Sequence, residues 1–413
     1  MGIQLHSEIG KLNGVILHTP GPEVENMIPK NAERALYSDI LNLSEVDKEY
    51  SQFRALLGKL TKTYQVADLL VEVLADETQK KEFVQDILRL ENVNENTDYL
   101  LSLSTTELTR QLIEGVVMRK DSLTKFLSSE RYSMRPLHNF LFTRDASSAI
   151  WDRVMINSMA SPIRLRESII MEYIFKYHPL FKATTMNPRR EEELRPGIHT
   201  EGGDIQVISK DLLVIGASVR TTTQGIDYIL NQVRNLTSPI NILVQELPET
   251  PESFIHLDMV FTHIAEDQCV VFDPVITRPN RYKTVHIAVD NGKVTISTET
   301  NLLTILKNLG FDLEPISCGG LNDPWVQERE QWHSGANFFA VAPGKIIGYN
   351  RNIYTIEALN NKGYEVIEAE EILNGSKEIS KTRKTVITIP GSELARGGGG
   401  ARCMTMPFHR DLL

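Results

Sequence analysis

The sequence predicts an α/β fold that is built from about five similar modules and carries an inserted helical bundle. Two observations predict it. A polar motif followed by a strand, a tight turn and a second strand recurs along the chain. Between residues 75 and 133, apolar residues recur at helical spacing instead. Modules of about 55–70 residues around an axis would bring their leading polar motifs to one central mouth.

The first 74 residues predict a strand, a helix, and then a second strand followed closely by another helix. The first strand covers residues 12–17 and leads into a turn rich in proline and glycine. The first helix covers residues 45–61, and the second strand with its helix covers residues 63–74.

Residues 75–133 predict the inserted bundle. Apolar residues lie three or four apart within three runs, at positions 83–88, 108–116 and 123–127. Ser104 and Glu107 have the spacing of a capping box before the second run. We therefore expect a segment that is almost entirely helical.

Four copies of the strand-rich pattern follow residue 133. They cover residues 142–157, 201–216, 256–273 and 333–349 and begin with the motifs FTRD, EGGD, HLD and HSGAN. The strand at 12–17 is a possible fifth copy. Asp145, Glu201 and Asp258 lie 56 and 57 residues apart, which indicates a repeat. A further buried strand is expected at residues 385–389.

Composition excludes several classes of function. The chain has 44 Lys and Arg residues against 54 Asp and Glu residues, a net charge of −10. Such a chain is a poor candidate for binding nucleic acid or an anionic membrane. No run of about 18 apolar residues and no secretory signal pattern is present. The three cysteines are far apart, so we expect no disulfide framework and a location in the reducing cytosol.

Cys403 is the candidate nucleophile. It follows four consecutive glycines at positions 397–400, and a glycine-rich loop allows the backbone to approach a ligand closely. The alternative is that Cys403 is a small buried apolar residue, as free cysteines usually are. That alternative is much stronger for Cys269 and Cys318, which lie in apolar strand patterns.

His256 and three carboxylates are candidates for acid–base chemistry and charge binding. His256 and Asp258 are two residues apart, so on a strand they would project to the same face. Glu201 lies on a glycine turn, and Asp145 ends the motif of the first copy. Taken singly, these residues could equally be a core histidine, a turn residue and an ion-paired carboxylate. Their equivalent places in the repeat favour a shared site.

Two arginines complete the candidate site. Arg164 and Arg220 each follow an acidic motif by nineteen residues, although surface ion pairing would also explain them. Several carboxylates beside a thiol indicate a cationic electrophile, and a planar guanidinium forms forked hydrogen bonds with carboxylates. The arginines would bind a substrate carboxylate. A molecule with both groups is arginine.

The motifs resemble those of the arginine deiminases, within the superfamily of guanidine-modifying enzymes. The similarity covers nearly the whole chain and includes SEIGKLNGVILHTPG at 7–21, NFLFTRD at 139–145, HTEGGD at 199–204 and VRTT at 219–222. It continues in HLDMVFT at 256–262, EREQW at 328–332 and GSELARGGGGARCMTMPFHRD at 391–411. The resemblance implies a pseudo-fivefold, five-bladed α/β propeller formed by residues 1–74 and 134–413. Residues 75–133 would then be the inserted helical bundle.

The resemblance also implies hydrolysis of L-arginine to L-citrulline and ammonia in the cytoplasm, with neither metal nor organic cofactor. Cys403 would attack the guanidinium carbon and form a thiouronium intermediate, with His256 as the acid and base. Asp145 and Asp258 would hold the guanidinium, and Glu201 would orient both His256 and the guanidinium. Arg164 and Arg220 would bind the α-carboxylate, and Asn139 and Phe142 would line the pocket. The family implies a homo-oligomer, a dimer or larger.

One departure from the family pattern affects the nucleophile loop. Many relatives carry a bulky residue, often arginine, five positions before the nucleophile, where this chain has Gly398. Two alternatives therefore stay open. The chain could modify another guanidine, such as methylated arginine or agmatine, or it could bind arginine without turning it over. Arg164 and Arg220 argue against agmatine, which has no carboxylate.

Overall fold

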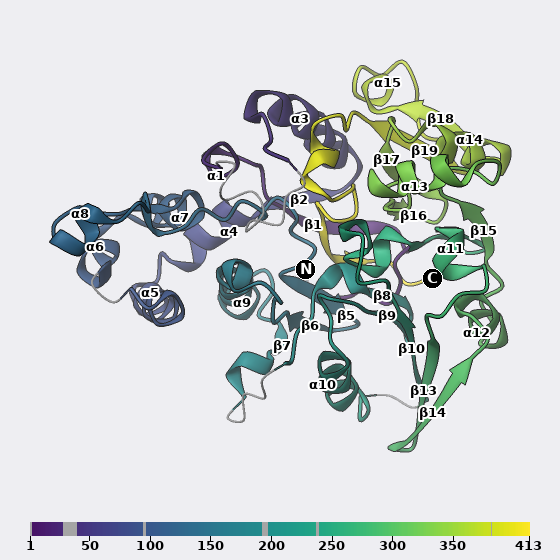
Figure 1. The fold of residues 1–413 in the computed structure, drawn as a ribbon, viewed down its shortest axis with the longest axis horizontal. Coiled ribbons are helices and arrows are strands. Elements are labelled where there is room, and N and C mark those ends of the chain that lie inside the picture. Colours follow the sequence, from purple (N-terminus) through teal and green to yellow (C-terminus); the bar gives the residue numbers. More distant parts are fainter. Residues whose placement is uncertain (1, 28–38, 94–95, 192–196, 237–238, 381) are drawn as a thin grey trace.

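The computed structural model describes residues 2–27, 39–93, 96–191, 197–236, 239–380 and 382–413. The fold is mixed α/β. Figure 1 shows small sheets at the centre with helices around them, while helices α5 (Glu77–Glu91) to α8 (Leu123–Leu127) extend to one side. Among the described residues, no helix has the length and apolar character needed to cross a membrane.

The N-terminal elements agree with the prediction. The strand predicted at 12–17 is β1 (Leu12–Leu17), followed by the short helix α1 (Pro22–Glu25). The predicted helix is α3 (Leu43–Leu60), which begins two residues early because the side chain of Asn42 accepts a hydrogen bond from the Ser44 N–H. The predicted strand and helix at 63–74 are β2 (Lys62–Gln65) and α4 (Val66–Val73).

The segment predicted to be almost entirely helical also contains two short strands. Its other helices are α6 (Thr97–Ser102) and α7 (Thr105–Glu114). Ser104 caps α7 by accepting from the Glu107 N–H, but the Glu107 carboxylate binds Arg110 instead of completing the capping box. Strand β3 (Val116–Val117) pairs antiparallel with β4 (Tyr132–Met134). Gly115 ends α7 at φ 99°, and the β-branched valines after it favour extended backbone.

All four predicted hairpins are present, each as an antiparallel pair. They are β5 (Ser147–Ile150) with β6 (Arg153–Ile156), β8 (Ile205–Ser209) with β9 (Leu212–Ala217), β11 (Phe261–Ala265) with β12 (Gln268–Val271), and β16 (Phe339–Ala342) with β17 (Lys345–Tyr349). The sequence repeat therefore corresponds to a repeated structural unit.

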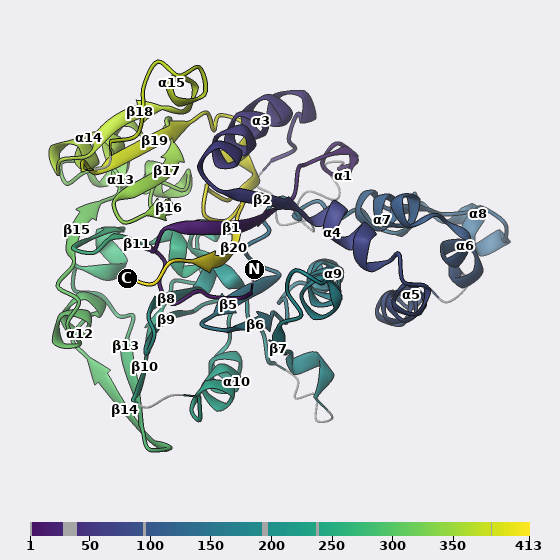
Figure 2. The same cartoon turned by 180° about the vertical axis from the view of Figure 1, so that it is seen from behind.

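A third strand pairs in parallel with the second strand of each hairpin. These third strands are β7 (Thr184–Met186), β10 (Ile240–Glu246), β15 (Glu314–Ser317) and β19 (Thr385–Ile389), the last of which is the strand predicted at 385–389. The possible fifth copy has the same order, because β1 pairs antiparallel with β20 (Met406–Arg410) and parallel with β2. Figure 2 shows β1 beside β20, so the two ends of the chain share one sheet.

The remaining elements extend or cover these sheets. Strands β13 (Thr284–Asp290) and β14 (Lys293–Glu299) extend the sheet of β8–β10, and β18 (Glu365–Glu368) pairs with β19. The other helices are α9 (Leu165–Tyr177), α10 (Thr223–Val233), α11 (Asp273–Ile276), α12 (Leu302–Asn308), α13 (Pro324–Trp332), α14 (Ile353–Asn361) and α15 (Ala369–Leu373). Helix α9 contacts both α4 and α5 and so joins the helical segment to the sheets.

Buried Glu49 on α3 anchors the segment that leads into the glycine run. Its carboxylate accepts hydrogen bonds from three consecutive backbone N–H groups, those of Ser392 at 2.8 Å, Glu393 at 3.1 Å and Leu394 at 2.9 Å. The segment therefore has its backbone donors satisfied before the flexible glycines begin.

We expect Glu49→Ala to lower the free energy of unfolding by about 2–4 kcal/mol, because it leaves buried N–H donors without a charged acceptor. Denaturation in urea measures this change. Glu45→Ala on the same helix is the control. Glu45 forms an exposed ion pair with Lys48, so its loss should cost less than about 1 kcal/mol. Equal losses for the two variants would contradict the anchoring role.

Candidate active site

One cavity of about 510 Å³ brings the predicted site residues together. Its lining includes Cys403, His256, Asp145, Glu201, Arg164, Arg220, Asn139 and Phe142. Asp258 is the one predicted site residue outside this lining, but its Oδ2 atom lies 3.8 Å from the Sγ atom of Cys403. The structure thus gathers a thiol, an imidazole, carboxylates and guanidinium groups from distant parts of the sequence.

The repeat explains how these residues meet. Asp145 lies just before β5, Glu201 before β8, His256 and Asp258 before β11, and Cys403 before β20. Each therefore comes from the segment leading into the first strand of a hairpin. Equivalent positions in the repeated sheet supply different chemical groups to one cavity.

Hydrogen bonds link these leading segments to one another in a closed ring. The links are Gly202 N to Asp145 O (3.2 Å), Leu257 N to Asp204 Oδ1 (2.9 Å), Asn337 Nδ2 to Asp258 O (3.3 Å), Arg402 N to Asn337 Oδ1 (2.9 Å), and Arg144 N to Cys403 O (3.1 Å). The last link returns to the first segment, so hydrogen bonds that each involve at least one backbone atom set the relative positions of the site residues.

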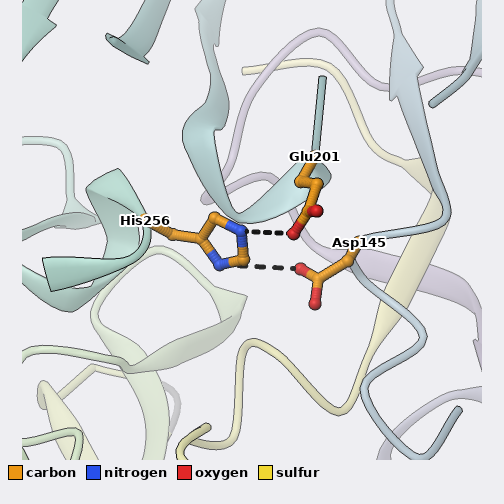
Figure 3. A group of neighbouring side chains, drawn as sticks. All are labelled: Asp145, Glu201 and His256. Atoms are coloured by element: carbon orange, nitrogen blue, oxygen red, sulfur yellow. Dashed lines mark hydrogen bonds and ion pairs between the residues drawn. The ribbon is translucent and has the colours of Figure 1, made fainter. Parts of the chain in front are cut away.

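His256 faces two carboxylates, as Figure 3 shows. Its Nε2 atom is 2.9 Å from Glu201 Oε2, and its Nδ1 atom is 3.8 Å from Asp145 Oδ1. Burial alone would lower the pKa of His256, but the carboxylates of Asp145 and Glu201 raise it to about 9. The imidazole is therefore protonated at neutral pH and can act as a general acid.

The sequence predicted that His256 and Asp258 project to the same face of a strand, and this prediction is wrong. His256 is extended and precedes a 3-10 turn at Leu257–Met259, which comes before β11. Their side chains consequently have different partners. His256 contacts Glu201, whereas Asp258 accepts a hydrogen bond from Arg402 at 2.7 Å.

Cys403 is buried, and its environment opposes ionisation of the thiol. Burial and the carboxylates of Asp258 and Asp145 raise the pKa of Cys403 well above its ordinary value. Arg402 only partly offsets this effect, because its guanidinium also bonds to Asp258 and Glu8. A positive charge that entered the cavity would favour the thiolate.

Two carboxylate oxygens at the site lack a hydrogen-bond donor among the described residues. They are Asp145 Oδ1 and Asp258 Oδ1, both buried. Their companion Oδ2 atoms accept from Arg164 at 2.8 Å and from Arg402 at 2.7 Å. Because buried carboxylate oxygens normally have hydrogen-bond donors, these two atoms indicate a ligand with N–H groups.

The two predicted arginines differ in their surroundings. Arg164 is buried and bonds to both Asp145 and Glu167 at 2.8 Å. Arg220 lines the mouth of the cavity, and its guanidinium forms no ion pair with the described part of the chain. Arg220 is therefore the cation that is available to a ligand carboxylate, while Arg164 is already engaged with carboxylates of the protein.

The glycine run shapes the wall that faces Phe142. A Cβ atom at Gly399 would come within 2.4 Å of the Phe142 ring, so this position requires glycine. Gly398 has φ 83°, lines the cavity, and has no atom within 4 Å of where a Cβ would stand. Asn139 and Phe142 both line the cavity as predicted.

Among the side chains that contact the predicted site residues, sequence reasoning missed Glu167 and Asn337. Glu167 forms the second ion pair of Arg164, and Asn337 donates a hydrogen bond to Cys403 Sγ. Asn337 belongs to the HSGAN motif, which leads into the fourth hairpin. Its place in the repeat, equivalent to those of the other site residues, could have identified it.

The site could geometrically hold a metal ion, but its charges oppose one. Potential ligand atoms of Asp145, Glu201 and His256 lie within 4.8 Å of one another. Arg164 Nη1 lies 2.8 Å from Asp145 and 3.9 Å from Glu201, and His256 is protonated at neutral pH. These positive charges would repel a divalent cation, whereas an organic cation could share the carboxylates through hydrogen bonds.

Comparisons with known proteins point to one family. The sequence profile of the family described as arginine deiminase matches residues 33–410. The chain is 33% identical to an arginine deiminase of Bacillus cereus, with 99% of this chain and 98% of that protein covered. It is 36% identical to an arginine deiminase of Borreliella afzelii at the same coverage.

Solved structures show a similar fold at much lower identity. A dimethylarginine dimethylaminohydrolase in an adduct with S-methyl-L-thiocitrulline has a TM-score of 0.51 and 12% identity, covering 96% of this chain and all of that one. An amidinotransferase from Microseira wollei has a TM-score of 0.54 and 13% identity, covering all of this chain and 98% of that one.

We expect Glu201→Gln to lower the pKa of His256 from about 9, because burial then opposes protonation with only Asp145 and Asp204 left to raise the pKa. An NMR titration of the His256 ring measures this pKa. Glu249→Gln is the control, since Glu249 is an exposed carboxylate on the same cavity. An unchanged pKa in the Glu201 variant would contradict the pairing.

The same pair makes stability depend on pH. The folded-state pKa of His256 is raised above the unfolded value of 6.5, so the stabilisation is complete below pH 6.5 and is lost as pH rises through about 9. The Glu201 variant should show a smaller loss between pH 6.5 and 9 when unfolding is followed in urea, because Asp145 and Asp204 remain.

Proposed function

The chain belongs to the arginine deiminase family, and we propose that it hydrolyses L-arginine to L-citrulline and ammonia through a covalent intermediate on Cys403. The observation that carries this proposal is that Asp145 Oδ1 and Asp258 Oδ1 have no hydrogen-bond donor in the described part of the chain, while Asp258 Oδ2 lies 3.8 Å from a buried thiol. A guanidinium donates N–H bonds in a forked geometry that suits carboxylate oxygens, and its positive charge would favour the thiolate.

Binding of the substrate prepares the nucleophile. In the free enzyme the pKa of Cys403 is raised by burial and by Asp258 and Asp145, so the thiol is neutral. A guanidinium bound to those carboxylates offsets their charge and lowers the pKa of the thiol, which loses its proton to solvent. The thiolate attacks the central guanidinium carbon and forms a tetrahedral adduct.

His256 then moves two protons. As an imidazolium it gives a proton to a terminal amino group of the adduct, which leaves as ammonia, and the thiouronium remains on Cys403. The neutral imidazole next accepts a proton from the attacking water. Collapse of the second adduct forms the urea group of citrulline, releases the thiolate and lets Cys403 regain a proton.

The other end of the substrate is held at the mouth of the cavity. Arg220 lines this mouth and has no ion pair with the described residues, so we assign it the α-carboxylate. Arg164 adds positive charge, and its Nη1 atom lies 2.8 Å from Asp145 Oδ2. The other oxygen, Asp145 Oδ1, is therefore available to the guanidinium. Asn139 and Phe142 enclose the aliphatic chain.

The sheets support the finer architecture that the sequence predicted, a five-bladed propeller. Five sheets of the described chain share an antiparallel pair followed by a parallel strand, and hydrogen bonds between their leading segments close into a ring. We assign residues 1–74 and 134–413 to this catalytic domain and residues 75–133 to the inserted helical bundle.

We also assign the enzyme to the cytoplasm, as a dimer or larger oligomer. All three cysteines are free, which suits a reducing compartment. Leu123, Phe126 and Leu127 on α8 leave 69–74% of their surfaces exposed. Burial against a second copy would remove this apolar surface from water.

We expect Cys403→Ala to abolish release of citrulline and ammonia from L-arginine while arginine still binds, because the carboxylates and Arg220 remain. A citrulline assay with calorimetry measures both properties. Cys269→Ala is the control and should retain turnover. Citrulline production by the Cys403 variant would exclude the covalent mechanism, and efficient turnover of agmatine would contradict the role of Arg220.

We expect Asp145→Asn to cost about 3–5 kcal/mol of transition-state stabilisation, roughly a 100- to 5,000-fold fall in kcat/KM, because a buried charge partner of the guanidinium is lost. Steady-state kinetics measures it. Asp152→Asn, an exposed acid in the turn between β5 and β6, should leave kcat/KM unchanged. Similar values for both variants would refute the assignment.

A further inference from the structure

Asn337 places a buried amide against the nucleophile. It lies between α13 and β16 and is 1% exposed. Its Nδ2 atom is 3.2 Å from Cys403 Sγ and 3.3 Å from the backbone oxygen of Asp258. Asn337 therefore contacts the reacting atom directly.

The backbone determines which way this amide faces. The N–H groups of Arg402 and Cys403 lie 2.9 Å and 3.3 Å from Asn337 Oδ1, and an N–H group needs an acceptor. The oxygen must therefore face these two donors. The amino group consequently faces the sulfur and the carbonyl oxygen of Asp258, so it donates to the sulfur.

We propose that Asn337 is a further catalytic residue, whose amide holds Cys403 Sγ in position for attack and preferentially stabilises its thiolate form. A hydrogen bond to an ionised acceptor is about twice as strong as one to a neutral acceptor, so the bond strengthens as the thiol loses its proton. This role rests on the covalent function proposed above for Cys403.

The other groups around the sulfur act on its thiolate form in opposite directions. The carboxylates of Asp258 and Asp145 oppose the thiolate. Arg402 favours the thiolate but bonds through its side chain to Asp258 and Glu8, and His256 lines the same cavity. The backbone of Gly400 also favours the thiolate through a hydrogen bond. The Tyr349 hydroxyl bonds to the Gly399 oxygen, and the backbone N–H of Arg144 bonds to the Cys403 oxygen. Asn337 supplies a neutral donor that touches the sulfur.

The last residue of the glycine run allows this contact. A Cβ atom at Gly400 would stand 2.6 Å from Asn337 Oδ1, closer than any normal contact. A side chain at position 400 would therefore displace the amide from the sulfur. Close packing of the amide on the loop is one reason why the run ends in glycine.

The test measures the thiolate without requiring turnover. Alkylation of Cys403 by iodoacetamide is followed by mass spectrometry across pH in the unsubstituted enzyme, Asn337→Ala and Asn337→Asp. Ser334→Ala is the matched control, since Ser334 lies in the same buried loop, away from the sulfur, and its hydroxyl has no hydrogen-bond partner among the described residues. Thermal unfolding of each variant reports folding separately.

We expect the alkylation midpoint to rise by about one pH unit or more in Asn337→Ala, seen below the midpoint as at least about tenfold slower alkylation. The rise should be larger in Asn337→Asp, because a carboxylate keeps the oxygen that faces the backbone donors but repels the thiolate. With L-arginine, kcat should fall while KM changes little. Ser334→Ala should match the unsubstituted enzyme.

Unchanged alkylation in folded Asn337 variants would overturn the proposal. If neither variant folds, the unsubstituted enzyme supplies the test, because the side-chain amide resonance of Asn337 should shift with pH at the midpoint of Cys403 alkylation. A resonance that does not shift through that midpoint would also overturn it. If L-arginine is not turned over but the Asn337 variants alter alkylation, the function proposed for the enzyme fails while the thiolate contact holds.

Discussion

Charge balance around one buried thiol is the constraint on which the site depends. Asp145, Glu201 and Asp258 are all at least 96% buried, and each pairs with a cationic group at 2.7–2.9 Å. Those partners are Arg164, His256 and Arg402. They leave two carboxylate oxygens without donors and a thiol whose pKa is raised. A guanidinium satisfies the oxygens and favours the thiolate at once, so recognition and activation are one event.

The repeated sheets bring the charged groups of the site together. Each leading segment contributes a different group at an equivalent place, and the ring of hydrogen bonds fixes the segments relative to one another. Site residues that are far apart in the sequence are thereby held close together without a long loop. The C-terminal strand β20 completes the sheet of β1, which places Cys403 opposite the acidic residues of the other sheets.

The sequence predicted what depends on local pattern. Hairpins show as paired apolar runs with tight turns, and the glycine run marks Cys403. Contacts between distant segments have no local sequence pattern that would predict them. The residues next to Arg164 in the sequence do not indicate that its guanidinium bonds to Asp145. The two-residue spacing of His256 and Asp258 is typical of a strand, but the structure has a turn there that separates their side chains. Asn337 was visible in its motif, but only the fold shows that its amide meets Cys403.

The most direct measurement of the central claim is mass spectrometry of the Cys403 peptide after acid quenching of a single turnover, with enzyme in excess over L-arginine. The account predicts that this peptide transiently gains the mass of arginine less ammonia, and that the gain decays as citrulline appears. Citrulline that forms in the single turnover while Cys403 stays unmodified at every quench time would contradict it.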